Sequence, residues 1–175
     1  MLRHWNKLLN TDCVVIDVGE HTIYPIFKVG SSTLMSVADK SYRNEEISRC
    51  GHIDVFLRDP GDRFVLGLNE YCRQNNLNVE DTWQLVEQGK LIDRHFAPQY
   101  IWLLHLYKFY KGMVTLRPFR HIKKITKVHK NKNIRNKVNV ALLRPFVEVD
   151  YQLMESINQT VDLGSIVRRQ KNVLS

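Results

Sequence analysis

The stretch that decides the fold is Ile23-Tyr24-Pro25-Ile26-Phe27-Lys28-Val29-Gly30-Ser31-Ser32-Thr33-Leu34. It begins as an apolar strand, passes through a glycine turn followed by hydroxyl side chains, and continues into a helical pattern. The N–H groups of a first helical turn have no partner within the helix, and the helix dipole favours negative charge there. Gly30 allows close backbone approach, and Lys28 adds a full positive charge. This order of strand, turn and helix predicts a pocket for phosphate or sulfate.

The pattern differs from the common nucleotide-binding loop. In the Walker pattern G-x-x-x-x-G-K-[ST] the lysine follows the second glycine, whereas here Lys28 precedes Gly30. No acidic partner for Mg²⁺ is evident nearby in the sequence. An ordinary strand followed by a helix capped by Ser or Thr is the alternative interpretation, and the sequence alone leaves it open.

The composition is that of one soluble globular domain. A chain of 175 residues, 43% hydrophobic and 25% charged, suits a single domain over 1–175 with a sizeable core. No run is apolar long enough to cross a bilayer, and the first ten residues lack the apolar centre of a secretory signal. We therefore expect a cytoplasmic protein, or a domain separated from its membrane anchor. The cysteines lack metal-ligand spacing and are expected to be reduced: Cys13, Cys50 and Cys72.

The net charge of +8 is concentrated in one segment. Residues 117–137 contain nine cations and no acid: Arg117, Arg120, Lys123, Lys124, Lys127, Lys130, Lys132, Arg135 and Lys137. The other 17 of the 26 Lys and Arg residues are balanced by 18 acids. This segment favours a polyanionic partner, an anionic cofactor, or both, and a solvated basic face is the alternative.

The pattern of apolar and turn residues predicts alternating strands and helices. Strands are expected at 13–18, 22–27, 52–57 and 113–117. Helices are expected at 32–43, 61–75, 82–88, 99–110, 119–126, 148–158 and 162–170, with a polar loop at 127–139. This order predicts an α/β fold, a single domain with a mainly parallel central sheet flanked by helices.

Two of the helices carry local start signals. Pro60 suits a first helical turn, and Asp59 suits the cap before it. Asn78 with Asp81 resembles a capping box that opens the helix at 82–88.

Arg58 follows the strand at 52–57 and is the second candidate for anion binding. Its planar guanidinium can hold a phosphate through two parallel hydrogen bonds. Arg63 offers a further contact, or a surface salt bridge with Asp59 or Asp62, and both alternatives stay open. Ligands of α/β sheets bind beyond the carboxyl ends of the strands, where Lys28 and Arg58 are both expected. Two such junctions imply a ligand with two separated phosphates.

These segments resemble motifs of the sulfotransferases. The Lys28 stretch is similar to that family's site for the 5′-phosphosulfate of 3′-phosphoadenosine-5′-phosphosulfate (PAPS). Phe56-Leu57-Arg58-Asp59-Pro60-Gly61-Asp62-Arg63-Phe64 resembles its 3′-phosphate motif. Asp93-Arg94-His95-Phe96-Ala97-Pro98-Gln99 resembles the D-x-H-[FW]-x-P-Q segment of the membrane-associated, Golgi-type (family 2) carbohydrate sulfotransferases. Val128-His129-Lys130-Asn131-Lys132 is similar to their late H-x-N-x-[ST] loop. The matches follow the family's order over about residues 22 to 135.

The resemblance implies a P-loop-like sulfotransferase fold and transfer of a sulfuryl group from PAPS to a hydroxyl acceptor. The expected acceptor is a carbohydrate, including an anionic glycan, and no metal is implied. Lys28 takes a catalytic role at the leaving oxygen. The implied contacts with the donor are Lys28, Val29, Gly30, Ser31, Ser32, Thr33, Arg58, Arg63, His129, Lys130 and Asn131. The expected source is bacterial or viral, or a Golgi lumenal domain without its anchor.

His95 is the candidate general base, because imidazole titrates near neutral pH. A structural hydrogen bond is the alternative role, and weaker candidates for the base are Asp93, Glu70 and His52. The chain also departs from the family pattern at two positions. Phe27 stands where proline is common, and Leu66 replaces a serine of the 3′-phosphate motif, which removes a hydroxyl contact.

Three other functions remain as alternatives. A nucleic-acid-binding protein could use residues 117–137 on phosphate backbones, although this leaves Lys28 and Arg58 unexplained and is not favoured. A P-loop kinase is not supported, because Lys28 precedes Gly30 whereas the lysine of the Walker pattern follows its second glycine. A degenerate sulfotransferase fold could serve only as a binding module.

Overall fold

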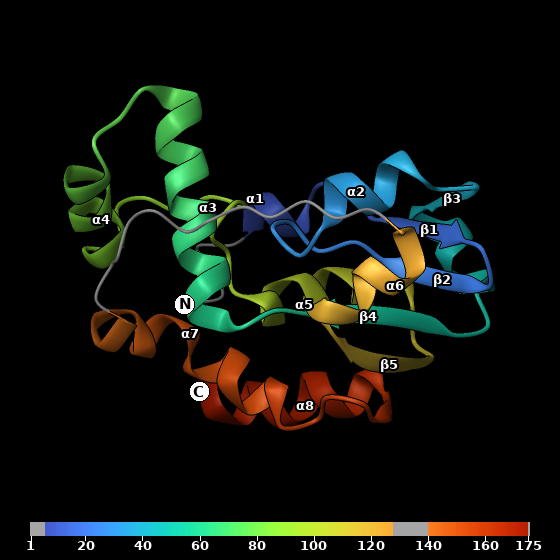
Figure 1. Cartoon of the computed structure of the whole chain (residues 1–175). Coiled ribbons are helices and arrows are strands. Elements are labelled where there is room, and N and C mark those ends of the chain that lie inside the picture. Colours follow the sequence, from blue (N-terminus) through green and yellow to red (C-terminus); the bar gives the residue numbers. More distant parts are fainter. Residues whose placement is uncertain (1–5, 128–139, 175) are drawn as a thin grey trace.

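The structure, a computed structural model, describes residues 6–127 and 140–174 and contains one six-stranded sheet (Figure 1). The strand order is β3-β1-β2-β4-β5-β6. The strands are β1 (Val14–Val18), β2 (His21–Tyr24), β3 (Lys40–Arg43), β4 (Ile53–Leu57), β5 (Met113–Pro118) and β6 (Thr160–Asp162).

The sheet is mixed, and the expected mainly parallel arrangement holds only for its three central strands. β2 pairs with β4, and β4 with β5, in parallel. β1 is antiparallel to both β2 and β3, and β6 is antiparallel to β5. The β1–β2 pair is antiparallel because a tight turn joins the strands, with Gly19 in the left-handed region at φ 58°. The α/β class predicted from sequence is confirmed.

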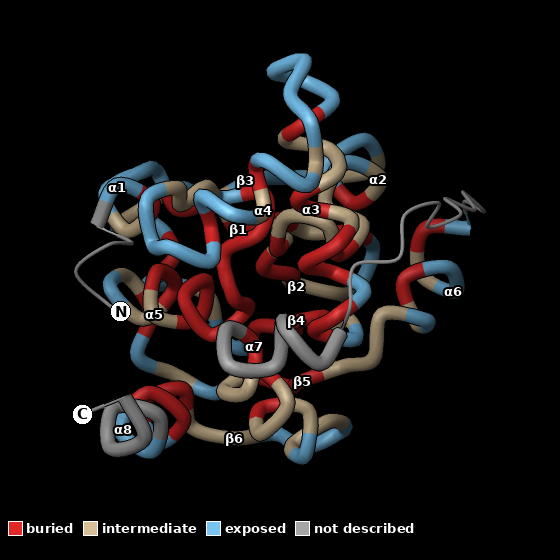
Figure 2. Tube along the Cα trace, turned by 90° about the vertical axis from the view of Figure 1, so that its left-hand side faces the viewer, coloured by how far each residue is buried: buried red, intermediate tan, exposed pale blue. Residues whose placement is uncertain are grey.

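Helices cover the sheet on both faces. α1 (Asn6–Leu9), α5 (Gln99–Phe109) and α8 (Leu163–Leu174) lie on one side, and α2 (Ser31–Ser36) and α6 (Ile122–Thr126) lie on the other (Figures 1 and 2). α3 (Pro60–Asn75) stands beyond the carboxyl end of β4, with α4 (Val79–Glu87) and α7 (Val140–Met154) beside it. The short 3-10 helices are η2 (Asn44–Arg49) and η3 (Phe119–His121).

The larger core cluster lies between the sheet and the helices on its two faces, and a smaller one lies between α3, α4 and α7. All five residues of β4 are buried, as expected for a central strand covered on both faces. α5 is buried along most of its length, because it lies against the sheet with α1 on one side of it and α8 on the other (Figure 2). No helix within residues 6–127 and 140–174 is both long and apolar enough to span a membrane.

The expected helix at 32–43 is wrong beyond Ser36. The chain instead forms β3, in which Arg43 is opposite Val14 and Lys40 is opposite Asp17. Asp39 extends this pairing, because its N–H donates to the Asp17 carbonyl at 2.8 Å. Long-range pairing with β1 thus overrides the local helical pattern. The expected strand at 22–27 ends at Tyr24, and β6 was not predicted.

Candidate functional site

The two predicted anion-binding loops follow neighbouring strands. β2 and β4 run parallel with Ile23 opposite Asp54 and Tyr24 opposite Val55. The Lys28 loop, residues 25–30, follows β2, and Arg58 follows β4. Both loops therefore start at the same edge of the sheet, where α/β proteins bind ligands.

The Lys28 loop is tightly curled. Lys28 has φ 63° and Gly30 has φ 71°, so two of three consecutive residues are left-handed. For a residue other than glycine, the left-handed conformation is unfavourable by about 1 kcal/mol or more. The contacts around Lys28 must therefore hold it in this conformation. Gly30 has a second constraint, because a Cβ there would lie 3.0 Å from Cδ1 of Ile122 and 3.4 Å from Cε2 of Phe119. The close approach at Gly30 thus accommodates η3 and α6.

α2 begins directly after this loop. Its N-cap is Gly30, and no side chain caps it. The side chain of Val29 is buried in the core, so only its main chain can serve a ligand. The three hydroxyl residues lie in the first turn, with Ser32 exposed and the other two half-buried: Ser31 and Thr33. This turn keeps the predicted set of N–H and hydroxyl donors together.

The main chain of Arg58 is hydrogen-bonded to Gln99, and its side chain stacks on Phe119. Its N–H donates to Oε1 of Gln99, and Nε2 of Gln99 donates back to the Arg58 carbonyl, both at 2.9 Å. The guanidinium carbon lies 4.5 Å from the ring centroid of Phe119. Burial lowers the pKa of Arg58, against the opposing charges of Asp62 and Asp59. Arg58 is therefore a fixed and partly desolvated cation, for which an anionic ligand is favourable.

Arg63 lies in the interior, and its burial excludes the surface salt bridge considered from sequence. Nε donates to the Phe27 carbonyl at 3.0 Å, and Nη1 donates to the Ala97 carbonyl. Burial lowers the pKa of Arg63 to about 10, and the charge of Asp150 opposes this. Nη2 is also buried and has no hydrogen-bond partner among the described residues, so the nucleotide contact predicted for Arg63 has no exposed donor in this structure. Arg63 thus joins the Lys28 loop to the 93–99 segment.

His95 packs against the residue that precedes Lys28. Its ring meets that of Phe27 edge to face, with centroids 5.7 Å apart. Nδ1 of His95 lies 2.5 Å from Oδ1 of Asp93, which also accepts from the His95 main-chain N–H at 2.9 Å. Phe27 further stacks on Trp102, with centroids 5.2 Å apart, and Arg94 lies over its ring. A carboxylate that orients an imidazole suits a general base, and it also suits a structural turn.

α3 touches both the Lys28 loop and the 93–99 segment through one face. Arg63, Gly67 and Glu70 are spaced by four and three residues and so lie on the same side of the helix. A Cβ at Gly67 would overlap the main-chain carbonyl of His95. Nζ of Lys28 lies 3.8 Å from Oε2 of Glu70. One helix therefore fixes the relative positions of the Lys28 loop and the 93–99 segment.

His52 is not brought to this site. It precedes β4, about 20 Å along the strand from Arg58 at 3.3 Å per residue. There its Nε2 contacts Oγ1 of Thr115 at 2.7 Å and lies 3.7 Å from Oδ1 of Asp54. This placement removes His52 from the candidates for the base.

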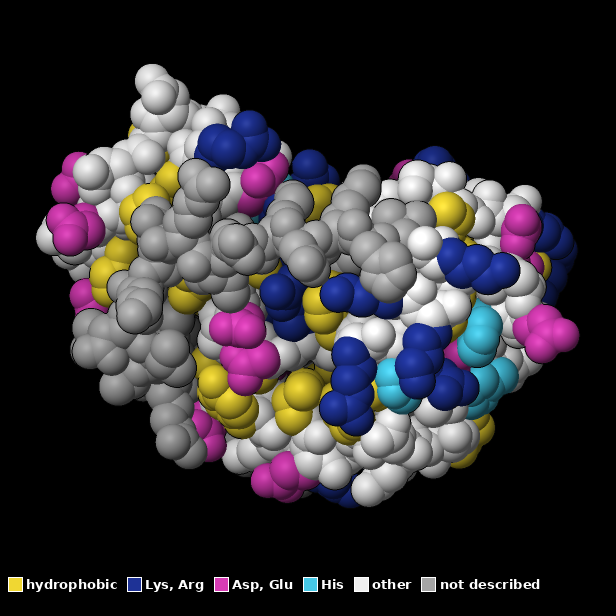
Figure 3. Space-filling model, in the orientation of Figure 1, with side chains coloured by type: hydrophobic (Ala, Val, Ile, Leu, Met, Phe, Trp, Pro, Cys, Tyr) yellow, Lys and Arg dark blue, Asp and Glu magenta, His cyan; other side chains and the backbone are white. Residues whose placement is uncertain are grey.

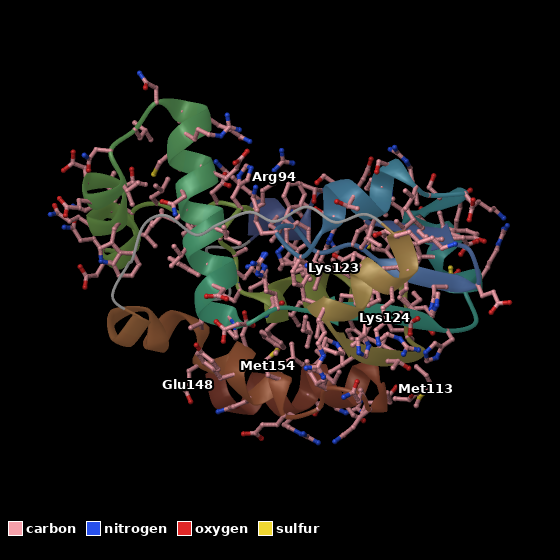
Figure 4. All side chains as sticks on the ribbon, viewed as in Figure 1. Arg94, Met113, Lys123, Lys124, Glu148 and Met154 are labelled. Atoms are coloured by element: carbon pink, nitrogen blue, oxygen red, sulfur yellow. The ribbon has the colours of Figure 1, made fainter. Side chains whose placement is uncertain are left out.

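Cations of the 117–127 segment cover the face of the sheet around α6, as the dark-blue side chains of Figure 3 show. Arg117 pairs with the buried Asp54, with Nε 2.8 Å from Oδ1. Lys123 and Lys124 are exposed on α6 (Figure 4). The predicted nucleotide contacts of the late loop lie outside the described residues: His129, Lys130 and Asn131.

Two structural roles in the site were not predicted. Gln99 was noted as part of a motif, yet only the fold shows that it holds the main chain of Arg58. Asp150 accepts hydrogen bonds from the N–H groups of Gln99 at 2.6 Å and Tyr100 at 2.8 Å, and so caps α5. No local signal marked Asp150, because its partners are about 50 residues away.

Comparison of the chain with protein-family models, with curated proteins and with solved structures finds no match. The resemblance to sulfotransferases therefore rests on the short motifs of the sequence alone. Within residues 6–127 and 140–174, no group of three or more His, Cys, Asp and Glu side chains is placed to hold a metal ion.

Proposed function

We propose that the protein is a sulfotransferase that moves a sulfuryl group from PAPS to a hydroxyl group, with a carbohydrate as the expected acceptor. One observation carries the proposal. The Lys28 and Arg58 loops follow adjacent parallel strands, and buried Arg63 ties the first loop to the segment whose Gln99 holds the second. Two basic loops held side by side suit a donor with a phosphate at each end.

The two ends of the donor call for different groups. Lys28 and the first turn of α2 offer an ammonium, N–H groups and hydroxyls, which suit the crowded oxygens of a phosphosulfate. Arg58 offers a guanidinium fork, which suits a single terminal phosphate. We assign the 5′-phosphosulfate to the first loop and the 3′-phosphate to the second.

The chemistry needs alignment and fixed charge. The acceptor oxygen forms a bond to sulfur while the bond between sulfur and the 5′-phosphate oxygen breaks. The electron pair stays on that oxygen, and the product is 3′-phosphoadenosine-5′-phosphate (PAP). Lys28 stabilises the growing negative charge on the leaving oxygen, and the loops hold the reacting atoms in line. His95, oriented by Asp93, accepts the proton of the hydroxyl group.

The acceptor is proposed from resemblance and charge. The exposed cations of α6, Lys123 and Lys124, belong to the 117–127 segment. The same segment also packs against Gly30 and Arg58. A glycan that carries acidic groups suits a surface with exposed cations. A Golgi lumenal location, or the cytoplasm of a bacterium or an infected cell, is compatible with this use of PAPS.

A thermal-shift titration with PAP, beside ATP–Mg²⁺, tests the class of donor. A ligand present at about 100 times its Kd stabilises a protein by about 2.7 kcal/mol, which is about 5–10 °C for a domain of this size. We expect this shift with PAP and not with ATP–Mg²⁺. Stabilisation by ATP–Mg²⁺ alone would identify a kinase, and salt-dependent binding of RNA or DNA without a PAP shift would favour a nucleic-acid-binding protein.

Two variants then separate binding from chemistry. Lys28→Ala should abolish sulfate transfer from labelled PAPS while the protein stays folded, and Arg58→Ala should mainly weaken PAP binding. Lys90→Ala, an exposed lysine on another surface, is the control. Normal turnover in both site variants would refute the assignment. PAP binding without sulfate transfer to any acceptor would indicate that the protein serves only as a binding module.

A further inference from the structure

The ion pair between Lys28 and Glu70 has a geometry that suits a temporary partner. Nζ and Oε2 are 3.8 Å apart, longer than a direct charged hydrogen bond of about 2.8 Å. The side chains are only 18% and 19% exposed, so water screens the pair weakly. Lys28 is therefore attracted toward α3, although its ammonium does not form a short bond with Glu70.

Glu70 itself is firmly placed. Oε1 accepts from Nη2 of Arg73 at 2.7 Å and from Nε2 of Gln74 at 2.9 Å, and Oε2 accepts from Nε of Arg73 at 3.3 Å. The hydrogen bond from Arg73 is the main cause that lowers the pKa of Glu70 to about 2, against its burial, with help from Gln74 and the charge of Lys28. Glu70 is thus a fixed carboxylate that stays ionised at any pH at which the protein works.

Leu66 lies one turn before Glu70 on α3. Leu66 precedes Glu70 by four residues, so the two side chains are neighbours on the helix surface. Leucine has no polar atom for an ammonium group. At this part of α3, Glu70 places a full negative charge 3.8 Å from the ammonium that the proposed function assigns to the leaving oxygen.

We propose that Glu70 is a positioning residue, the counter-ion that holds Lys28 before the donor binds and gives it up to the phosphosulfate. The inference rests on the proposed function, because it concerns the same lysine. Donor binding then exchanges a carboxylate for a more highly charged anion at Nζ. The cost of breaking the Lys28–Glu70 pair is subtracted from the affinity for the donor.

If Glu70 competes with the donor for Lys28, removing the charge of Glu70 should strengthen PAP binding, whereas a substitution that merely disturbs the fold should weaken it. Glu70→Gln removes the competing charge and keeps the shape of the side chain, so PAP should bind about fivefold more tightly. In the Lys28→Ala background the same substitution should change the Kd of PAP less than twofold, because there is no ammonium to release. Glu87→Gln, which removes a charge from exposed α4, should leave the Kd unchanged.

Isothermal titration of the four proteins of this double-mutant cycle with PAP is the test. If Glu70 only supports the fold, Glu70→Gln weakens PAP binding or changes it equally in both backgrounds, and the inference is overturned. A second measurement does not depend on PAP: the rate of reductive methylation of Lys28, followed by mass spectrometry against Lys90. This rate should rise several-fold in Glu70→Gln, and an unchanged rate also overturns the inference.

The failures of the two proposals are distinguishable. If the wild-type protein binds no PAP, the proposed function fails, and the role of Glu70 in donor binding fails with it, whatever the methylation rates show. Suppose instead that the wild-type protein binds PAP, and that Glu70→Gln changes the Kd of PAP equally in the wild-type and Lys28→Ala backgrounds. Then only the role of Glu70 fails.

Discussion

Gln99 and Arg58 exchange two hydrogen bonds, with the side chain of the first holding both the N–H and the carbonyl of the second at 2.9 Å. Gln99 is fully buried and is the first residue of α5, whereas Arg58 is the first residue after β4. The amide side chain thus takes the place of a neighbouring strand at the point where β4 ends. It fixes the direction in which the chain enters α3.

Gln99→Met should therefore destabilise the protein and weaken its proposed ligand site. Methionine has a similar volume, yet it leaves a main-chain donor and an acceptor of Arg58 without partners, at about 1–3 kcal/mol each. We expect a loss of about 3 kcal/mol in the free energy of unfolding, measured with urea, and weaker PAP binding. Gln88→Met at the exposed end of α4 is the control. Equal stability of the two variants would contradict this role of Gln99.

Asp150 should give the stability an unusual dependence on pH. Burial raises its pKa to about 6, against the hydrogen bonds from Tyr100 and Gln99 and the charge of Arg63. The folded state then holds the proton more tightly than the unfolded state, whose pKa is about 3.9. This stabilisation is present in full below pH 4 and is lost as the pH rises through 6, with a total of about 3 kcal/mol.

The measurement is urea unfolding of wild type and Asp150→Asn between pH 4 and 7. The difference between their unfolding free energies should shift in favour of the wild type as the pH falls. A difference that stays constant over this range would show that Asp150 keeps an ordinary pKa.

Local signals in the sequence predicted several elements of the fold well. Asp59 caps α3 by accepting from the Asp62 N–H at 2.9 Å, and Pro60 occupies the first turn, both as expected. Asn78 likewise caps α4. Such caps involve residues two or three positions apart, so a short window of sequence contains all of their chemistry. The placement of the Lys28 and Arg58 loops followed from the order of strands and helices alone.

Features that depend on distant partners could not be predicted in the same way. β3 exists because residues 40–43 pair with β1, and local propensity favoured a helix there. Arg63 was expected either to contact the donor or to form a surface salt bridge, and its burial was not predicted, since arginine is rarely buried without partners. Its partners are the carbonyls of Phe27 and Ala97, more than 30 positions away, which only the folded chain brings together.

Gly67→Ala should test the contact between α3 and the His95 segment. The added methyl group would overlap the His95 carbonyl, and main chain on both sides leaves little room to relax. We expect a loss of about 3 kcal/mol, at the upper end of the usual cost of overpacking. Gly51→Ala is a matched control, since a Cβ there meets nothing within 4 Å and its φ is ordinary. Equal melting temperatures would show that α3 can move away from His95.

His95→Gln should separate the two roles considered for this histidine. Glutamine can keep a hydrogen bond to Asp93, but it cannot accept a proton from a hydroxyl group near neutral pH. A general base contributes about 10²–10⁴-fold, so kcat for sulfate transfer should fall by at least about 10²-fold. The Kd of PAP should change less than twofold, because no donor contact is assigned to His95. If kcat survives while the melting temperature falls, His95 serves the structure of the 93–99 segment, and the base must be sought elsewhere.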